Sequence, residues 1–278
     1  MIGAIIGDIV GSYWEFNRIK DKDFTFLSTE KNFFTDDTLM SIAIGNAVMD
    51  AGKDFELLEK KAKEWMLYIG RKYPSGYGSM FKEWLKSDDP QPYNSLGNGA
   101  PMRISAVGIA YDNLEDVKQA SHAVTKVTHN HPEGLKAAEA IAVAIYHLRR
   151  GVSKHQLRRL IQPYYNLYRN LDEIRPRYYF TEKAQYTVPQ AVLSFLESTD
   201  FEDAIRNAVS LGGDADTLAA IAGSLAEAYY GIPESLNTQY PPYIYDDELL
   251  SYIEKFSQKY PTQIKPDVFY DDPLIFER

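Results

Sequence analysis

Apolar residues recur with the spacing of an α-helix along most of this chain, and this periodicity sets the fold class. Alanine is common where neighbouring helices would pack closely, and segments with the alternating pattern of a β-strand are scarce. The clearest helix is predicted over 133–150, where Pro132 suits the first helical position and Gly151 the stop. Other helices are predicted over 38–51, 54–69, 246–259, the segment after Asp200 and the segment from about Asp216. We therefore expect an all-α fold.

The composition restricts the classes of protein to which the chain can belong. Its 278 residues, 45% of them hydrophobic, suffice for one core, and we expect a single domain over 1–278. The 39 acidic and 30 basic residues give a net charge of -9, which argues against general nucleic-acid binding. The absence of cysteine excludes disulfides, thiolate zinc sites and a cysteine nucleophile. No segment approaches the roughly 20 apolar residues that cross a bilayer, so we expect a soluble protein without membrane contact. The absence of cysteine is compatible with a reducing cytoplasm, where we expect the chain to act, and we expect a monomer.

A short acidic motif occurs twice, at residues 35–39 (TDDTL) and 214–218 (DADTL), and each copy opens an apolar helix. One interpretation is N-capping, because Asp and Thr side chains accept hydrogen bonds from the free amides at a helix start. Capping needs one such side chain per helix, however, and each start carries two carboxylates. The surplus carboxylates indicate a second partner.

Bound cations are the partner that this surplus favours. If the two helix starts face each other, four carboxylates converge, and their repulsion is relieved by protonation or by cations. Oxygen ligands without histidine or cysteine favour hard divalent ions such as magnesium, manganese or calcium. Two ions about 3.5–4 Å apart would form a two-metal hydrolytic centre. The convergence itself is a hypothesis at this point, because the motifs are far apart in the chain.

The N-terminal segment 3–16 (GAIIGDIVGSYWEF) has two interpretations, a helix whose glycines allow close packing or a glycine-rich phosphate loop. The helix is favoured, because neither a Walker lysine nor a preceding strand is present. Asp8 interrupts the apolar run, which argues against a signal peptide. Glu15 lies between aromatic residues and is either a surface glutamate or a carboxylate of raised pKa, suited to proton transfer.

Two further polar segments are candidates for ligand contact. Residues 97–103 (GNGAPMR) predict a turn before a helical run through Val107, and the glycines would let backbone amides approach a diphosphate. Residues 128–132 (THNHP) precede the helix at 133–150. Their two histidines suit a zinc site, a phosphate contact or a helix cap. A zinc site is not favoured, because this segment offers no third nitrogen or sulfur ligand. The residues by themselves favour a helix cap.

Together these segments resemble the ADP-ribosylglycohydrolase family, which includes the dinitrogenase reductase activating glycohydrolase and the crystallin J1 relatives. The ordered match comprises residues 3–16, 35–38 (TDDT), 97–103, 128–134 (THNHPEG) and 212–217 (GGDADT). TDDT followed by a distant GGDADT is its most specific part. The resemblance implies a compact, orthogonally packed multi-helix all-α fold. It also implies a binuclear Mg²⁺ centre at the bottom of a cleft, with Mn²⁺ as the alternative metal.

The resemblance also implies roles for particular residues. Glu15 would be a mobile active-site carboxylate, and we expect it to be catalytic together with Asp36 and Asp216. The expected metal ligands are Thr35, Asp36, Asp37, Asp214, Asp216 and Thr217. The residues expected to contact ADP-ribose are Asn98, Gly99, Met102 and His129, with His129 near the phosphates or the distal ribose.

The implied reaction is hydrolysis of the glycosidic bond between ADP-ribose and an acceptor. The substrate would be an ADP-ribosylated protein or a small ADP-ribose conjugate. A water positioned by the metals would attack the anomeric carbon, activated by an aspartate or by Glu15, through an oxocarbenium-like state that carboxylates stabilise. The sequence does not single out arginine, serine, poly(ADP-ribose) or O-acetyl-ADP-ribose as the acceptor. Likeness to the nitrogenase-regulating bacterial members favours arginine.

Two other functions stay open in the sequence. The DADT segment at 214–217 is similar to the D-x-D-x-T motif of haloacid-dehalogenase-type phosphatases. That motif follows a hydrophobic strand, whereas the residues before Asp214 have helical spacing. The second alternative is a non-catalytic, crystallin-J1-like structural protein. The crowded carboxylates argue against it, because a structural protein has no need of them.

Overall fold

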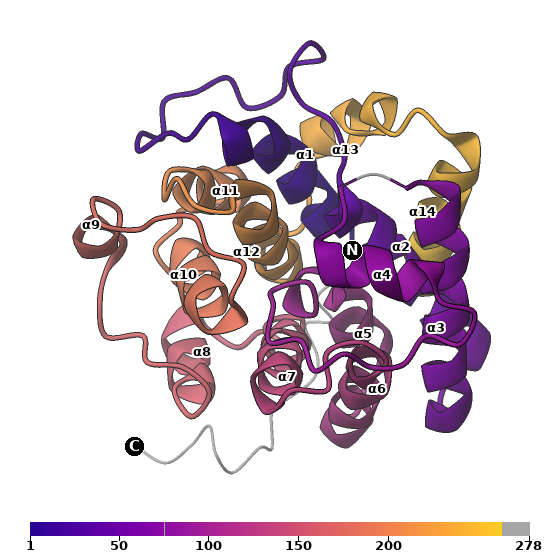
Figure 1. Cartoon of the computed structure of the whole chain (residues 1–278). Coiled ribbons are helices and arrows are strands. Elements are labelled where there is room, and N and C mark those ends of the chain that lie inside the picture. Colours follow the sequence, from indigo (N-terminus) through magenta and orange to yellow (C-terminus); the bar gives the residue numbers. More distant parts are fainter. Residues whose placement is uncertain (75, 263–278) are drawn as a thin grey trace.

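Fourteen α-helices and two short 3₁₀-helices form the regular structure of residues 1–74 and 76–262, which the computed structural model describes. No β-strand occurs in these residues, and Gly97 and Lys183 form an isolated antiparallel bridge. The all-α prediction is confirmed (Figure 1). The helices are α1 (Ile2–Phe16), α2 (Asp36–Ala51), α3 (Phe55–Lys72), α4 (Ser79–Lys86), η1 (Pro101–Arg103), α5 (Ser105–Ala110), α6 (Leu114–Lys126), α7 (Pro132–Leu148), α8 (Lys154–Ile161), α9 (Leu171–Ile174), α10 (Ala184–Leu196), α11 (Phe201–Val209), α12 (Ala215–Tyr230), α13 (Glu234–Gln239), η2 (Pro241–Tyr243) and α14 (Asp247–Lys259).

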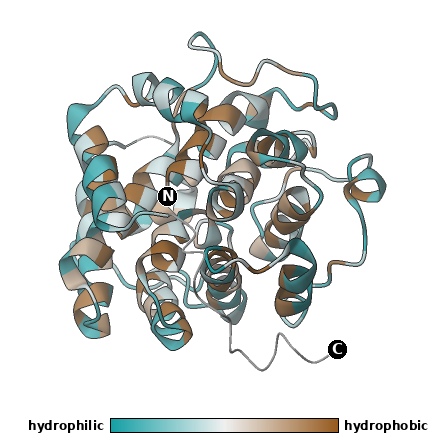
Figure 2. Ribbon diagram, turned by 180° about the vertical axis from the view of Figure 1, so that it is seen from behind, coloured by the Kyte–Doolittle hydropathy of each residue, from teal (hydrophilic) through white to brown (hydrophobic). Residues whose placement is uncertain are grey.

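Helices α1, α2 and α12 are buried on nearly every side and occupy the middle of the molecule. A helix that is apolar all round offers no solvent face, so other helices have to surround it. The surrounding helices, among them α3, α6 and α11, each turn one apolar face inward. Figure 2 shows hydrophobic residues along the helices and hydrophilic residues on the outer turns and connections. The central helices therefore hold most of their side chains away from solvent.

Helices α1 and α12 cross with their backbones in contact. A side chain at Gly7 would place its Cβ 2.0 Å from the carbonyl oxygen of Ala219, and one at Gly11 would lie 2.4 Å from that of Ala215. Real Cβ atoms do not approach so closely, so glycine is required at both positions. The prediction of a helix with close-packing glycines at 3–16 is confirmed. The crossing fixes the start of α12 beside the middle of α1, where Asp8 lies.

The helix starts follow the capping signals in the sequence. The Thr35 side chain accepts a hydrogen bond from the amide of Asp37 at the start of α2, and Asp200 caps α11 in the same way. His131 caps α7, with Pro132 at its first position. The bounds of the predicted helices differ from the observed ones by at most three residues. Such shifts are expected where a cap rather than the apolar pattern sets the end.

Buried apolar residues from these helices form one continuous core. This core supports a single domain, which stays a prediction for 1–278 because residues 263–278 lie outside the described residues. Within the described part of the chain, no helix is long and apolar enough to cross a membrane.

Candidate active site and metal centre

A cavity of about 510 Å³ opens beside the first turns of α2 and α12. All of the residues that the sequence analysis assigned to a site line this cavity. They are Glu15, Thr35, Asp36, Asp37, Asn98, Gly99, Met102, His129, Asp214, Asp216 and Thr217. Segments that are far apart in the chain thus contribute to one cavity.

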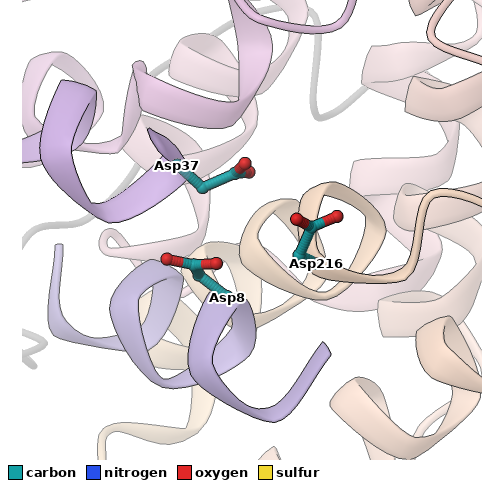
Figure 3. A group of neighbouring side chains, drawn as sticks. All are labelled: Asp8, Asp37 and Asp216. Carbon is teal, nitrogen blue, oxygen red and sulfur yellow. The ribbon is translucent and has the colours of Figure 1, made fainter. Parts of the chain in front are cut away.

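The two acidic helix starts meet at the base of this cavity. The Thr217 hydroxyl lies 3.3 Å from Asp37 Oδ2 and donates to it, which joins the first turn of α12 to that of α2. Carboxylate oxygens of Asp8, Asp37 and Asp216 all lie within 4.8 Å of one another, and Figure 3 shows the three side chains approaching from three helices. The convergence that the sequence left as a hypothesis is therefore present in the fold.

A second acidic group shares Asp216 with the first. Carboxylate oxygens of Glu15, Asp214 and Asp216 also lie within 4.8 Å of one another. Asp36 lines the cavity but belongs to neither acidic group. Its side chain lies against Gly76, where an added Cβ would be 3.0 Å from Asp36 Oδ1. Two adjacent acidic groups that share one carboxylate have the composition of a two-ion site.

Helix capping does not account for these carboxylates. Thr35 caps α2, which leaves Asp37 free, and Asp37 Oδ1 is buried without a hydrogen-bond partner among the described residues. Asp214 occupies the N-cap position of α12 but makes no capping hydrogen bond; its Oδ2 accepts one from Asn98 Nδ2 at 2.7 Å instead. A buried carboxylate oxygen without a donor is costly unless a cation binds it. The donor set, oxygen atoms alone, suits a hard divalent cation.

Asp8 is a site residue that the sequence analysis missed. Its Oδ1 accepts from the Thr35 hydroxyl at 2.7 Å, and its Oδ2 accepts from the amides of Thr35 at 2.8 Å and Thr38 at 3.1 Å. The Thr38 hydroxyl also donates to Oδ2. Because four donors already occupy its oxygens, Asp8 orders the start of α2 and has less free acceptor capacity than Asp37. A lone carboxylate inside an otherwise apolar, buried helix was the available signal.

The Asp8 contacts predict a large effect of truncation. In Asp8→Ala, the buried amide of Thr38 loses its acceptor, and we expect the free energy of unfolding to fall by about 2–4 kcal/mol. Asp54 caps α3 through an exposed hydrogen bond from Leu57, so Asp54→Ala is the matched control, with an expected loss of about 1 kcal/mol. Urea unfolding near pH 6 measures both. Equal losses in the two variants would contradict this role of Asp8.

Burial and mutual repulsion raise the pKa values of the clustered carboxyls. Burial, and then the charge of Asp216, raise the pKa of Asp8 to about 7 and that of Glu15 to about 8. The same two causes raise the pKa values of Asp36, Asp37 and Asp214 well above the usual range. At neutral pH the cluster therefore holds protons, unless cations replace them.

The glycine-containing loop before η1 and His129 form another part of the cavity wall. A Cβ at Gly99 would lie 3.2 Å from His129 Nε2, so the loop approaches the imidazole closely. Met102 Sδ accepts a weak hydrogen bond from the Thr217 hydroxyl at 3.9 Å. His129 lines the cavity whereas His131 caps α7, so the two histidines have different roles.

The family model of the ADP-ribosylglycohydrolases matches residues 1–264. The chain belongs to the ADP-ribosylglycohydrolase family. It is 25% identical to human ADP-ribosylhydrolase ARH3 over 336 aligned positions, which cover 93% of each chain. It is 26% identical to the ADP-ribosyl-(dinitrogen reductase) glycohydrolase of Rhodospirillum rubrum, over 84% of this chain and 85% of that one. A solved structure described as an ADP-ribosylglycohydrolase-related protein complex has the same fold, with a TM-score of 0.67, 24% identity and coverage of 93% and 95%.

Membership of the ADP-ribosylglycohydrolases decides between the alternatives. The chain is an enzyme that hydrolyses ADP-ribose conjugates, in agreement with its relatives, so the structural-protein alternative is not supported. The phosphatase alternative is wrong, because α11 (Phe201–Val209) precedes Asp214 where that motif requires a strand. The resemblance found in the sequence is confirmed.

Proposed function

We propose that this ADP-ribosylglycohydrolase hydrolyses its substrates with two Mg²⁺ ions, which Mn²⁺ can replace, bound at the start of α2 and α12. The observation that carries the proposal is the buried, unpaired Asp37 Oδ1 beside Asp216. Asp36, Asp214, Thr35 and Thr217 would complete the set of oxygen ligands. Bound cations of this kind neutralise the carboxylates and polarise the ribose hydroxyls and water that they contact.

Glu15 is the residue best suited to move a proton in this site. It stands at the end of α1, half-buried, on the cavity wall, and its pKa is raised to about 8 by burial and by neighbouring carboxylates. Such a carboxyl exchanges protons readily near neutral pH. Glu15 accepts a proton from the attacking water or gives one to the leaving acceptor. Asp36 and Asp216 are the other candidates for proton transfer, and their charge stabilises the oxocarbenium-like state.

The remaining predicted residues would bind ADP-ribose. The backbone amide of Gly99 can approach the diphosphate, because glycine leaves no side chain between it and the cavity, whereas the Asn98 amide already donates to the carbonyl oxygen of Glu182 at 2.7 Å. Asn98 also holds Asp214 in place. Met102 and His129 line the same wall. A volume of about 510 Å³ lies in the range of small-molecule sites.

Arginine is the acceptor that the charge of the cavity favours. Glu15 and Glu182 line the cavity outside the proposed set of metal ligands, and the guanidinium of ADP-ribosylarginine is a cation, so the leaving group would be attracted to them electrostatically. The substrate would be an ADP-ribosylated protein or a small conjugate. Serine-linked ADP-ribose, poly(ADP-ribose) and O-acetyl-ADP-ribose are the competing substrates. A cytoplasmic monomer stays the prediction from the sequence.

Release of free ADP-ribose tests this proposal directly. The full chain is incubated with ADP-ribosylarginine, ADP-ribosylserine and O-acetyl-ADP-ribose, each with Mg²⁺ or with a chelator, and the products are separated by chromatography. We expect release from the arginine conjugate to be fastest and to stop in chelator. Equal rates with and without metal would contradict the two-ion site, and faster release from another conjugate would replace arginine as the acceptor.

The raised carboxyl pKa values predict how stability depends on pH. The ordinary pKa is 3.8 for Asp and 4.5 for Glu, whereas folding raises the pKa of Asp8 to about 7 and that of Glu15 to about 8. At a pH between the ordinary and the raised pKa of each group, the folded state binds more protons than the unfolded state. The metal-free protein therefore loses stability as the pH rises through this interval. Mg²⁺ displaces these protons, and its stabilising effect is therefore larger at about pH 8 than at about pH 6. Thermal unfolding with and without Mg²⁺ measures both trends; a metal-free Tm that rises over this interval would contradict them.

A further inference from the structure

Arg103 is a buried cation on the cavity wall that the functional residues named so far do not use. It lies at the end of η1, with 3% of its surface exposed, and it lines the cavity. No ion pair among residues 1–74 and 76–262 includes it. Burial lowers the pKa of the guanidinium to about 10, so it stays charged at neutral pH. A buried, charged arginine without a carboxylate partner indicates a negatively charged ligand.

Arg103 supplies a positive charge in a cavity that is lined by several carboxylates. Arg103 is the only lysine or arginine among the described residues that line it, whereas Glu15, Asp36, Glu182 and other carboxylates surround the same space. An ADP-ribose conjugate brings a diphosphate with two negative charges into the cavity. A cation on the part of the wall formed by η1 and the loop before it therefore favours placing the diphosphate there.

A hydrogen-bonded chain connects Arg103 to His129. Arg103 Nη2 donates to the Thr128 hydroxyl at 2.6 Å, and this hydroxyl lies 2.8 Å from His129 Nδ1. A guanidinium can only donate, so the Thr128 oxygen accepts from it. This polarises the hydroxyl and favours donation of its own proton to Nδ1 over acceptance of a second hydrogen bond. Nδ1 is then an acceptor. The proton of the neutral imidazole resides on Nε2.

The Nε2 atom faces the loop at which the diphosphate would lie. A Cβ at Gly99 would be 3.2 Å from Nε2, and one at Gly97 would be 3.7 Å away, so small residues leave the imidazole edge open. Burial and the charge of Arg103 lower the pKa of His129 well below its usual range, which keeps the ring neutral. A neutral ring with its proton on Nε2 presents one N–H donor to the cavity.

We propose that Arg103 and Thr128 are positioning residues that fix His129 as an Nε2–H donor to a phosphate oxygen of the substrate. The inference rests on the proposed function, because it takes the anionic ligand to be the diphosphate of an ADP-ribose conjugate. Arg103 adds its positive charge behind the imidazole. The opposite tautomer would present a lone pair, which repels a phosphate oxygen.

The test uses four substitutions and two measurements. Thr128→Val removes the hydroxyl at constant shape, and Thr128→Ser restores it. Thr125→Val is the matched control, because Thr125 is also buried and its hydroxyl has no hydrogen-bond partner among the described residues. Long-range ¹H–¹⁵N spectra of histidine-labelled full chain identify the tautomer of His129, with His129→Gln as the assignment reference. Steady-state kinetics with the ADP-ribosylated substrate give KM and kcat separately.

We expect the Nε2–H tautomer of His129 in the wild type, in Thr125→Val and in Thr128→Ser, and a mixture of tautomers in Thr128→Val. In Thr128→Val we expect KM to rise about tenfold, while kcat changes by less than about threefold. An Nδ1–H tautomer in the wild type, or an unchanged KM in Thr128→Val, overturns the inference while hydrolysis by the wild type persists. Absence of hydrolysis in the wild type instead overturns the proposed function, and the phosphate contact with it.

Discussion

Asp216→Asn is expected to make the metal-free protein more stable and to abolish hydrolysis. Asp216 belongs to both acidic groups. After burial, its charge is the largest cause of the raised pKa at five neighbouring carboxyls, which are Asp8, Glu15, Asp36, Asp37 and Asp214. Removal of this charge relieves repulsion in the folded state. We expect the metal-free Tm to rise by about 2–6 °C.

The same substitution removes a ligand that both proposed ions share. We expect Mg²⁺ no longer to raise the Tm, and the rate of ADP-ribose release to fall by about a thousandfold or more. Thermal unfolding with Mg²⁺ or a chelator and the ADP-ribose release assay measure the two effects. Asp88→Asn, at an exposed position, is the control for loss of one negative charge. A lower metal-free Tm, or hydrolysis within tenfold of the wild type, would contradict the account.

Gly7→Ala is expected to have the largest effect on stability. The added Cβ would lie 2.0 Å from the carbonyl oxygen of Ala219 and 2.7 Å from the amide nitrogen of Ala220, so only separation of α1 from α12 can accommodate it. Both obstructing atoms belong to the backbone of a buried helix and cannot rotate away. We expect the free energy of unfolding to fall by about 3 kcal/mol or more.

Gly45→Ala is the matched control for this prediction. Gly45 is also buried within a helix, but its added Cβ would meet only side-chain atoms, Met1 Sδ at 3.0 Å and Phe256 Cδ2 at 3.3 Å. These side chains can adjust, and the helix propensity gained is the same at both positions. We expect a change within about 1 kcal/mol. Separation of the helices at Gly7 would also move the adjacent Asp8, which orders the start of α2. We therefore expect Mg²⁺ binding to weaken in Gly7→Ala but not in Gly45→Ala. Similar stabilities of the two variants in urea would contradict the close crossing.

The residues that gather at the cavity could be predicted because their signals are local. The TDDT and DADT segments carry more carboxylates than capping requires, and this excess is visible without a structure. The structure shows why the excess exists: Thr35 and Asp8, rather than Asp36 or Asp37, accept the amides at the start of α2, and Asp214 accepts from Asn98 instead of capping α12. Helices with clear caps and breakers, such as α7 and α11, could also be predicted from adjacent residues.

Asp8 could not be assigned in the same way, because its partners lie elsewhere in the chain. Thr35 and Thr38 are 27 and 30 residues away, and no local pattern indicates that a carboxylate in α1 orders the start of α2. Helix α10 is a second example. It contains Pro189, which removes a backbone donor and predicts a break, but burial of one face against the core overrides this local signal. Helix α6 has a capping Asn113 and a regular apolar face, so the sequence did contain its signal.

The location of bound divalent cations tests the central claim most directly. A crystal of the full chain grown with Mn²⁺ gives anomalous scattering that locates each ion independently of its ligands. We expect two adjacent peaks in the cavity, both near Asp216, with Asp37 and Asp214 among the contacts. Well-ordered acidic side chains with no anomalous peak among them, or peaks confined to surface carboxylates, would contradict it.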